Sequence, residues 1–140
     1  PDSTNPGIEQ ITATSMVLYV DNTLVDASAP YTLRPWRVRY RIDGTQLVRE
    51  VVKPVGTAPP YTYGAYTGTE VMVNGIANTS STPLFAAFTS EGAALPATVV
   101  SPDNLRIGRV RLRLLIKYAN GNSSPTAEFT TDVAPRNPAN

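Results

Sequence analysis

Arginine is the residue type whose spacing in this chain points most directly to a function. Two segments, 36–42 and 109–114, alternate arginine with apolar residues at every second position. Guanidinium groups bind phosphate and carboxylate oxygens, so a row of them on one sheet face is a candidate surface for nucleic acid or an acidic partner. The candidate site residues are Arg37, Arg39, Arg41, Arg109, Arg111 and Arg113.

Two functions are open for these arginine rows. They either bind DNA phosphates, with an affinity that falls as salt rises, or keep a sheet face soluble while their aliphatic stems cover apolar surface. The net charge is only +1, so attraction of DNA would have to be local. If Glu50, Glu128 and Asp132 lie beside the arginines across the strands, their charges cancel. We favour this second arrangement and expect no DNA binding.

Enzyme chemistry has few carriers in this sequence. Cysteine and histidine are both absent, which removes thiol nucleophiles, imidazole mechanisms, disulfides and zinc sites of the ordinary ligand type. The carboxylates are scattered, and none belongs to a motif with a mechanism. We therefore predict no catalytic residue, no cofactor and no metal. Asp21, Asn22 and Asp26 offer oxygen ligands for Ca²⁺, but their spacing fits no defined calcium loop, and an ordinary turn is favoured.

Two further motifs have a structural and a functional interpretation. Tyr61, Tyr63 and Tyr66 lie in a range rich in proline and glycine, 53–68, which predicts a long loop. Their rings either form a platform for a glycan or peptide or, as we favour, hold the loop against the sheet. Asn78 and Asn122 each begin an N-x-[ST] pattern, which matters only in a cell that glycosylates exported proteins.

Length and composition predict one domain, residues 1–140, of mainly β structure. The 13 prolines and 9 glycines suit many short strands better than helices, and no apolar run is long enough to span a bilayer. We expect an antiparallel sheet of about seven strands, formed by the ranges 11–21, 36–42, 47–52, 69–76, 84–88, 105–118 and 127–133. The predicted core residues are Trp36, Val38, Tyr40, Leu47, Val110, Leu112, Leu114 and Phe129.

The first arginine segment is expected to form one arm of a hairpin. Period two places its apolar residues on the buried face and its three arginines on the exposed face. Asp43-Gly44 is a strong hairpin signal, and a two-residue turn there would place Arg37 opposite Glu50.

Three segments, in sequence order, resemble prepilin-type minor pilins and pseudopilins, and by pattern are most similar to the minor pilins and the J-type pseudopilins. The range 37–50 is similar to that family's "VRYRLDGxxLYRE" hairpin, and Ser81-Thr82-Pro83-Leu84-Phe85 is similar to its "STPLF" element. The ranges 106–115 and 129–137 are similar to its "IRxVRVxLxV…FTTxVxLRN" ending. The resemblance covers most of residues 9–137.

The resemblance implies a structural subunit that primes, caps or decorates a type IV pilus or a type II secretion pseudopilus. Its partners would be other pilin or pseudopilin subunits, contacted through loops 53–68 and 89–103 and through an N-terminal helix that anchors the protein in the inner membrane before assembly. That helix is not among residues 1–140, and residues 1–10 are expected to be the stub that follows it. The implied location is the cell surface or periplasm. An adhesive or DNA-binding module, as in DNA uptake, is the alternative, and a generic β-sandwich module is third.

Overall fold

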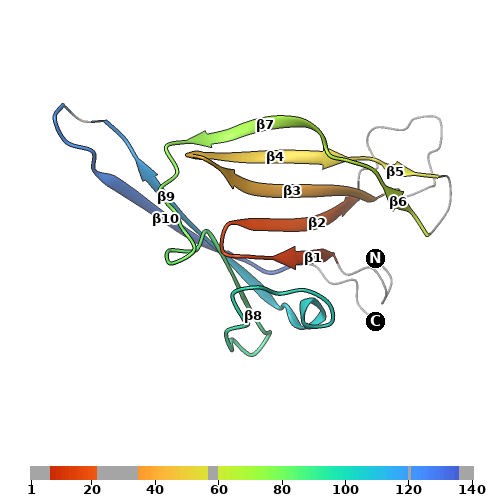
Figure 1. Ribbon diagram of the computed structural model, residues 1–140. Helices are drawn as coiled ribbons and strands as arrows, with labels where there is room; N and C mark the ends of the chain where they lie inside the picture. The colour runs from red at the N-terminus through yellow and green to blue at the C-terminus, as the bar shows by residue number, and fades with distance from the viewer. Residues whose placement is uncertain (1–6, 22–34, 57–59, 120, 136–140) are drawn as a thin grey trace.

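The fold is a set of antiparallel strands in a computed structural model that describes residues 7–21, 35–56, 60–119 and 121–135 (Figure 1). The prediction of a mainly β fold is confirmed. The strands are β1 (Ile8–Ile11), β2 (Ser15–Asp21), β3 (Pro35–Asp43), β4 (Gln46–Val52), β5 (Pro54–Val55), β6 (Thr62–Tyr63), β7 (Thr67–Asn74), β8 (Phe85–Phe88), β9 (Arg109–Lys117) and β10 (Thr126–Val133), and a 3-10 turn, η1, covers Asp103–Arg106.

The strands form two main sheets. The larger has the order β1-β2-β3-β4-β7, the smaller has the order β10-β9-β8, and β5 and β6 make a separate short pair. Figure 1 shows the β9–β10 hairpin running obliquely past one end of the larger sheet, with its tip projecting beyond that sheet. The two arginine segments therefore belong to different sheets.

The core lies between the inner faces of the two main sheets. Its buried residues are Ile8, Ile11, Leu47, Ile76, Leu84, Phe85, Ala87, Val99, Ile107 and Val110. Tyr40 and Ile42 of β3 pack against this cluster from one sheet, and Leu112 and Leu114 of β9 pack against it from the other. Because side chains alternate along a strand, the arginines of both strands point away from this core.

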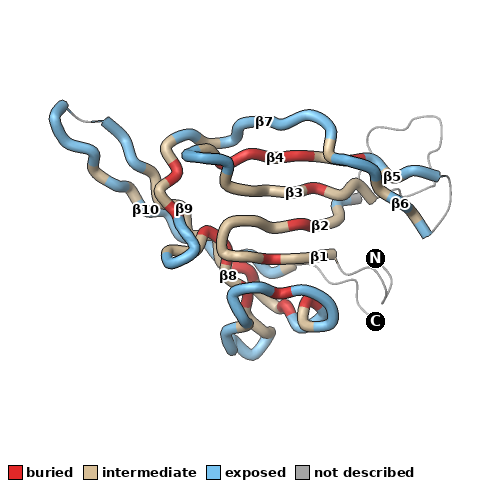
Figure 2. Tube along the Cα trace, in the orientation of Figure 1, coloured by how far each residue is buried: buried red, intermediate tan, exposed pale blue. Residues whose placement is uncertain are grey.

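Two predicted core positions are wrong. Val38, Leu47 and Val110 are buried as predicted, and Tyr40, Leu112 and Leu114 are half-buried. Trp36 is also half-buried but lies outside the core cluster, with the Lys53 ammonium 5.0 Å from its ring centroid. Phe129 is 61% exposed, because β10 is the last strand of its sheet and nearly all of it faces solvent (Figure 2).

The strand predicted over 11–21 is two strands joined by a tight turn. Thr12 N–H donates to the Ser15 carbonyl at 2.8 Å, and the Thr12 hydroxyl donates to the same oxygen at 3.3 Å. β1 then pairs antiparallel with β2. The turn contains no glycine, proline, asparagine or aspartate, so the sequence carries no turn signal there.

The strand predicted over 105–118 begins later, at Arg109. Residues 103–106 form η1 instead, and Gly108 N–H donates to the Phe88 carbonyl at 2.9 Å. The other predicted strands lie within two residues of β3, β4, β7, β8 and β10. Asn22 and Asp26, where the sequence favours an ordinary turn, fall outside the described residues.

The hairpin predicted over 36–52 is confirmed as β3–β4, but its register differs. Asp43 pairs with Gln46, so the two loop residues are Gly44 and Thr45. Gly44 has a φ of 58°. Glycine with positive φ at the first loop position is the pattern of a type II′ turn. This turn sets Arg39 opposite Glu50, and the predicted pairing of Arg37 with Glu50 is wrong.

Within the described ranges, no helix is long and apolar enough to cross a membrane.

Candidate functional site

Arg37 of β3 binds a carboxylate from two strands away. Its Nε and Nη2 atoms donate to the two oxygens of Glu9 at 2.7 and 2.6 Å. The register of β1 shifts between Ile8 and Gln10, so Glu9 is the extra residue of a bulge that redirects its side chain. The Arg37 hydrogen bond lowers the pKa of Glu9. Burial, followed by the 2.8 Å hydrogen bond that Tyr19 donates to Glu9, raises the pKa of Tyr19.

Glu50 of β4 is a buried carboxylate shared by the other two arginines of β3. Arg39 donates to it at 2.6 Å, and Arg41 donates through Nε and Nη2, both at 3.1 Å. The Glu50 side chain is only 8% exposed. The Arg41 hydrogen bond, aided by that of Arg39, holds the pKa of Glu50 below its ordinary 4.5 despite the opposing effect of burial. Arg41 also pairs with Asp43 at 3.0 Å.

The β3 arginines lie flat along the outer face of the larger sheet. Their side chains are only 26–33% exposed, so the three arginines predicted to be exposed are half-buried. Beneath them Val17, Val48 and Val52 are buried, although these valines are on the face that points away from the core. The aliphatic arginine stems therefore shield apolar surface while their guanidinium groups stay paired.

The tyrosines of the 61–66 segment contact this face. The Tyr66 ring lies 4.2 Å from the Arg39 guanidinium carbon, and the Tyr63 hydroxyl donates to the Pro35 carbonyl at 2.8 Å. The Tyr63 and Tyr19 rings are 5.4 Å apart. Burial raises the pKa of both Tyr63 and Tyr66. These contacts confirm, for Tyr63 and Tyr66, the prediction that the tyrosines hold their segment against the sheet.

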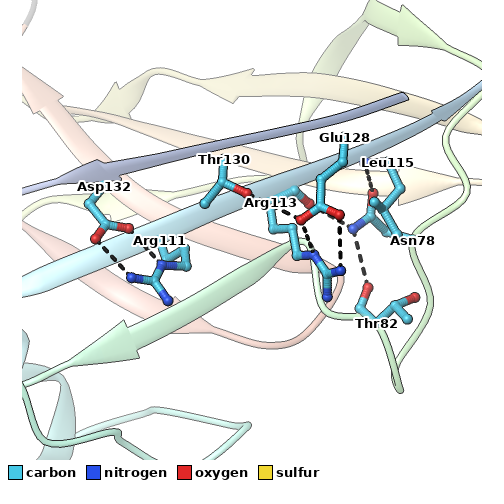
Figure 3. A network of polar contacts seen from close by, with 8 residues as sticks. All are labelled: Asn78, Thr82, Arg111, Arg113, Leu115, Glu128, Thr130 and Asp132. Atoms are coloured by element: carbon cyan, nitrogen blue, oxygen red, sulfur yellow. Dashed lines mark hydrogen bonds and ion pairs between the residues drawn. The ribbon is translucent and has the colours of Figure 1, made fainter. Parts of the chain in front are cut away.

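The second arginine row lies on β9 and pairs with acids of β10 (Figure 3). Arg111 binds Asp132 through two hydrogen bonds of 2.8 and 3.1 Å, and Arg109 reaches the same carboxylate at 3.3 Å. Arg113 binds Glu128 at 2.8 and 3.2 Å. The arginine hydrogen bonds lower the pKa values of both Glu128 and Asp132.

All six candidate arginines thus pair with nearby carboxylates. Glu50, Glu128 and Asp132 interleave with the arginines as the sequence analysis predicted. Sequence reasoning missed Glu9 and Asp43. Asp43 is two positions beyond Arg41 on the same strand, and this period-two spacing is a signal that finds it. To predict that Glu9 pairs with Arg37 requires knowledge of the β1-β2-β3 order and of the bulge, which no local pattern supplies.

The remaining candidate motifs separate clearly. Asn78 is buried, and its amide nitrogen donates to the Arg113 carbonyl at 2.7 Å, so its N-x-[ST] pattern marks a structural side chain. Asn122 is exposed. In the ranges that the structure covers, no group of three or more His, Cys, Asp or Glu residues could hold a metal. The proposed calcium ligands fall at the edge of, or outside, the described residues.

Comparison of the chain with known protein families, with curated proteins and with solved structures finds no match. The class of this protein is therefore defined by its architecture alone. The chain is a mainly antiparallel β domain whose charged outer faces are internally paired.

The carboxylates that pair with the β3 arginines predict that the fold is sensitive to acid. Glu9 and Glu50 have lower pKa values in the folded state than the ordinary 4.5. The stability that they contribute is present above that pH and is lost as pH falls through their folded pKa values. We expect urea unfolding, measured from neutral pH down to about pH 2.5, to show this decline. Glu50→Gln should lower the unfolding free energy at pH 7 by about 1–2 kcal/mol and flatten the decline.

A matched control removes an exposed pair on the same sheet. Glu70 is 63% exposed and bonds Arg49 at 3.3 Å, so Glu70→Gln should change stability at pH 7 by less than about 0.5 kcal/mol. Equal losses in the two variants would contradict a special contribution of Glu50.

Proposed function

We propose that this chain is the globular head of a minor pilin or pseudopilin, a structural subunit that primes, caps or decorates a type IV pilus or a type II secretion pseudopilus. The observation that carries the proposal is the ordered resemblance of three segments. In the fold, 37–50 forms the β3–β4 hairpin, 81–85 leads into β8, and the last segment supplies β9 and β10. The resemblance therefore follows the framework of the domain.

The short 81–85 segment has a structural reason for its composition. Leu84 is fully buried, and Phe85 is 5% exposed. Leu84 N–H donates to the Ala13 carbonyl at 2.7 Å, and its own carbonyl accepts from Arg113 N–H at 2.9 Å. The segment thus ties the β1–β2 turn of one sheet to β9 of the other. Such a role suits a domain that works as a rigid building block.

The chemistry of the surface favours contact with other proteins over catalysis. The six arginines are paired, and the sequence has no cysteine or histidine. We predict that the purified domain has no hydrolase or transferase activity and holds no stoichiometric cofactor. An assay that found either one would contradict this proposal.

The proposal is tested with the full-length protein in its own cell. We expect the coding sequence directly before Pro1 to encode a basic leader and a long apolar helix. Affinity purification of the full-length protein should recover other subunits with apolar N-terminal helices, and deletion of the gene should reduce filament number or secretion. An upstream sequence without such a helix, or unchanged filaments and secretion, would refute it.

DNA binding is the alternative that the paired charges argue against. We expect a fluorescence titration with duplex DNA at physiological salt to show no salt-sensitive binding by the wild-type domain. Glu128→Gln combined with Asp132→Asn frees the β9 arginines and should create binding that weakens as salt rises. The opposite result is wild-type binding, with a Kd of about 10⁻⁴ to 10⁻⁶ M, that Arg39→Glu plus Arg111→Glu abolishes. That result would establish the DNA-binding function.

A further inference from the structure

β10 is an open sheet edge without the usual protection against pairing. Its eight residues pair with β9 in unbroken register, and its other edge meets no described strand. Natural edge strands are commonly guarded by proline, a bulge or charged side chains, lysine above all. β10 contains no proline, lysine or bulge, and its two charged residues, Glu128 and Asp132, pair with β9 arginines. By contrast, β7 at the edge of the larger sheet carries two register shifts. β10 is therefore the edge best suited to accept another strand.

The backbone groups available on that edge follow from β9. The N–H groups of Arg113, Leu115 and Lys117 bond to Leu84, Asn78 and Gly75, on the side of β9 away from β10. Their cross-strand partners are Thr130, Glu128 and Thr126. In an antiparallel pair, the N–H and C=O groups of two directly opposed residues either both point toward the other strand or both point away from it. The outward N–H and C=O groups of β10 therefore belong to Thr126, Glu128, Thr130 and Asp132.

The side chains of β10 also suit a partner strand. Phe129 and Val133 are 61% and 57% exposed, on the face that they share with Leu112 and Leu114 of the core-facing side. Glu128 and Asp132 project from the other face, where β9 arginines neutralise them. Figure 2 shows β10 exposed along nearly its whole length. The strand thus offers unpaired backbone, uncovered apolar side chains and acidic groups that are already paired with arginines.

We propose that two copies of this chain pair through β10, antiparallel, about a two-fold axis at Thr131. This register sets Phe129 opposite Val133 of the second copy, twice, and such aromatic–β-branched pairs are favourable. It also sets Asp132 opposite Thr130 and Glu128 opposite Ala134, so that no two acidic residues are opposed. An axis at Thr130 would instead oppose Glu128 to Asp132, an axis at Glu128 would oppose that residue to itself, and an axis at Phe129 would leave Val133 without a partner in β10. The side chains of β10 are therefore complementary to those of a second copy in the Thr131 register.

The pairing extends the three-stranded sheet across the axis and closes as a dimer. An isologous contact uses the same patch on both partners, so it leaves no further β10 edge free. The inference concerns the domain itself and does not depend on the proposed place in a filament.

Cross-linking tests the register, because the chain has no native cysteine. Thr131→Cys places two thiols at directly opposed non-hydrogen-bonded positions, about 4.5 Å apart at Cα, which a disulfide can bridge. We expect oxidation to give a covalent dimer of twice 15.0 kDa. Val133→Cys, on the same face of the same strand, should stay monomeric because its counterpart lies four positions away. Failure of Thr131→Cys to cross-link, or equal cross-linking by both variants, would overturn the register.

Sedimentation of the wild-type domain tests the dimer itself. We expect a reversible monomer–dimer equilibrium with a Kd below about 1 mM, and Phe129→Lys should raise that Kd at least tenfold. Val55→Lys is the control, since Val55 is 62% exposed on a different sheet and should leave the dimer intact. Circular dichroism and melting verify that each variant folds. A wild type that stays monomeric, assembles beyond a dimer, or dimerises unchanged with Phe129→Lys would refute the proposal.

Discussion

Replacing Gly75 by alanine is expected to lower the unfolding free energy by about 3 kcal/mol or more. Gly75 has a φ of 79°, in the left-handed region that alanine disfavours by about 1–2 kcal/mol. An alanine Cβ would also lie 2.5 Å from the Lys117 backbone oxygen. Gly75 cannot simply move away, because its own carbonyl accepts a 2.7 Å hydrogen bond from Lys117 N–H. The close approach joins the end of β7 to β9, and hence one sheet to the other.

Gly121→Ala is the matched control for this substitution. Gly121 has a similar φ of 61°, but no atom lies within 4 Å of its added Cβ. It should therefore show the conformational cost alone, about 1 kcal/mol. In thermal unfolding we expect a fall in Tm of roughly 10 °C for Gly75→Ala and roughly 4 °C for Gly121→Ala. Equal shifts would mean that the contact with Lys117 contributes nothing.

Local patterns of the sequence were enough to predict the strands that carry the arginines. Period-two alternation identified β3 and β9, and Asp43-Gly44 identified the hairpin, because both signals act between near neighbours. The register was wrong because Gly44 occupies the first loop position, not the second, and this moves Arg39 opposite Glu50. A turn signal locates a hairpin, whereas the turn type decides its register.

Features that depend on the arrangement of the two sheets could not be predicted. Phe129 alternates like a core residue, yet it is exposed because no described element covers the inner face of an edge strand. The pairing of Glu9 with Arg37 depends on a bulge in β1 and on the position of β2 between them. Neither fact has a local signature. For the candidate site, sequence therefore predicted the cations and part of their neutralisation, while tertiary structure supplied the rest.

The role of Asn78 likewise has no local signature in the sequence. Its replacement is expected to cause the second large loss of unfolding free energy. Beside β9, where a strand would normally pair, the Asn78 side chain takes the place of a backbone (Figure 3). Its Nδ2 donates to the carbonyls of Arg113 and Thr82 at 2.7 and 3.2 Å, and its Oδ1 accepts from Leu115 N–H at 2.8 Å. Asn78→Ala leaves these partly buried backbone groups unpaired, which should cost about 2–4 kcal/mol of unfolding free energy.

Asn78→Asp separates the contribution of the donor group of Asn78 from that of its acceptor oxygen. Aspartate keeps an oxygen for Leu115 N–H, but an ionised carboxylate has no donor for the two carbonyls that it then faces. We expect a loss at neutral pH at least as large as that of Asn78→Ala. The control is Asn74→Ala. It removes one exposed hydrogen bond, which Gln46 Nε2 donates to Asn74 Oδ1 at 2.8 Å, and should cost less than about 1 kcal/mol of unfolding free energy. Urea unfolding gives the three values, and faster amide exchange at Leu115 in both Asn78 variants would localise the effect. Losses no larger than that of the control would show that water replaces the Asn78 side chain without penalty.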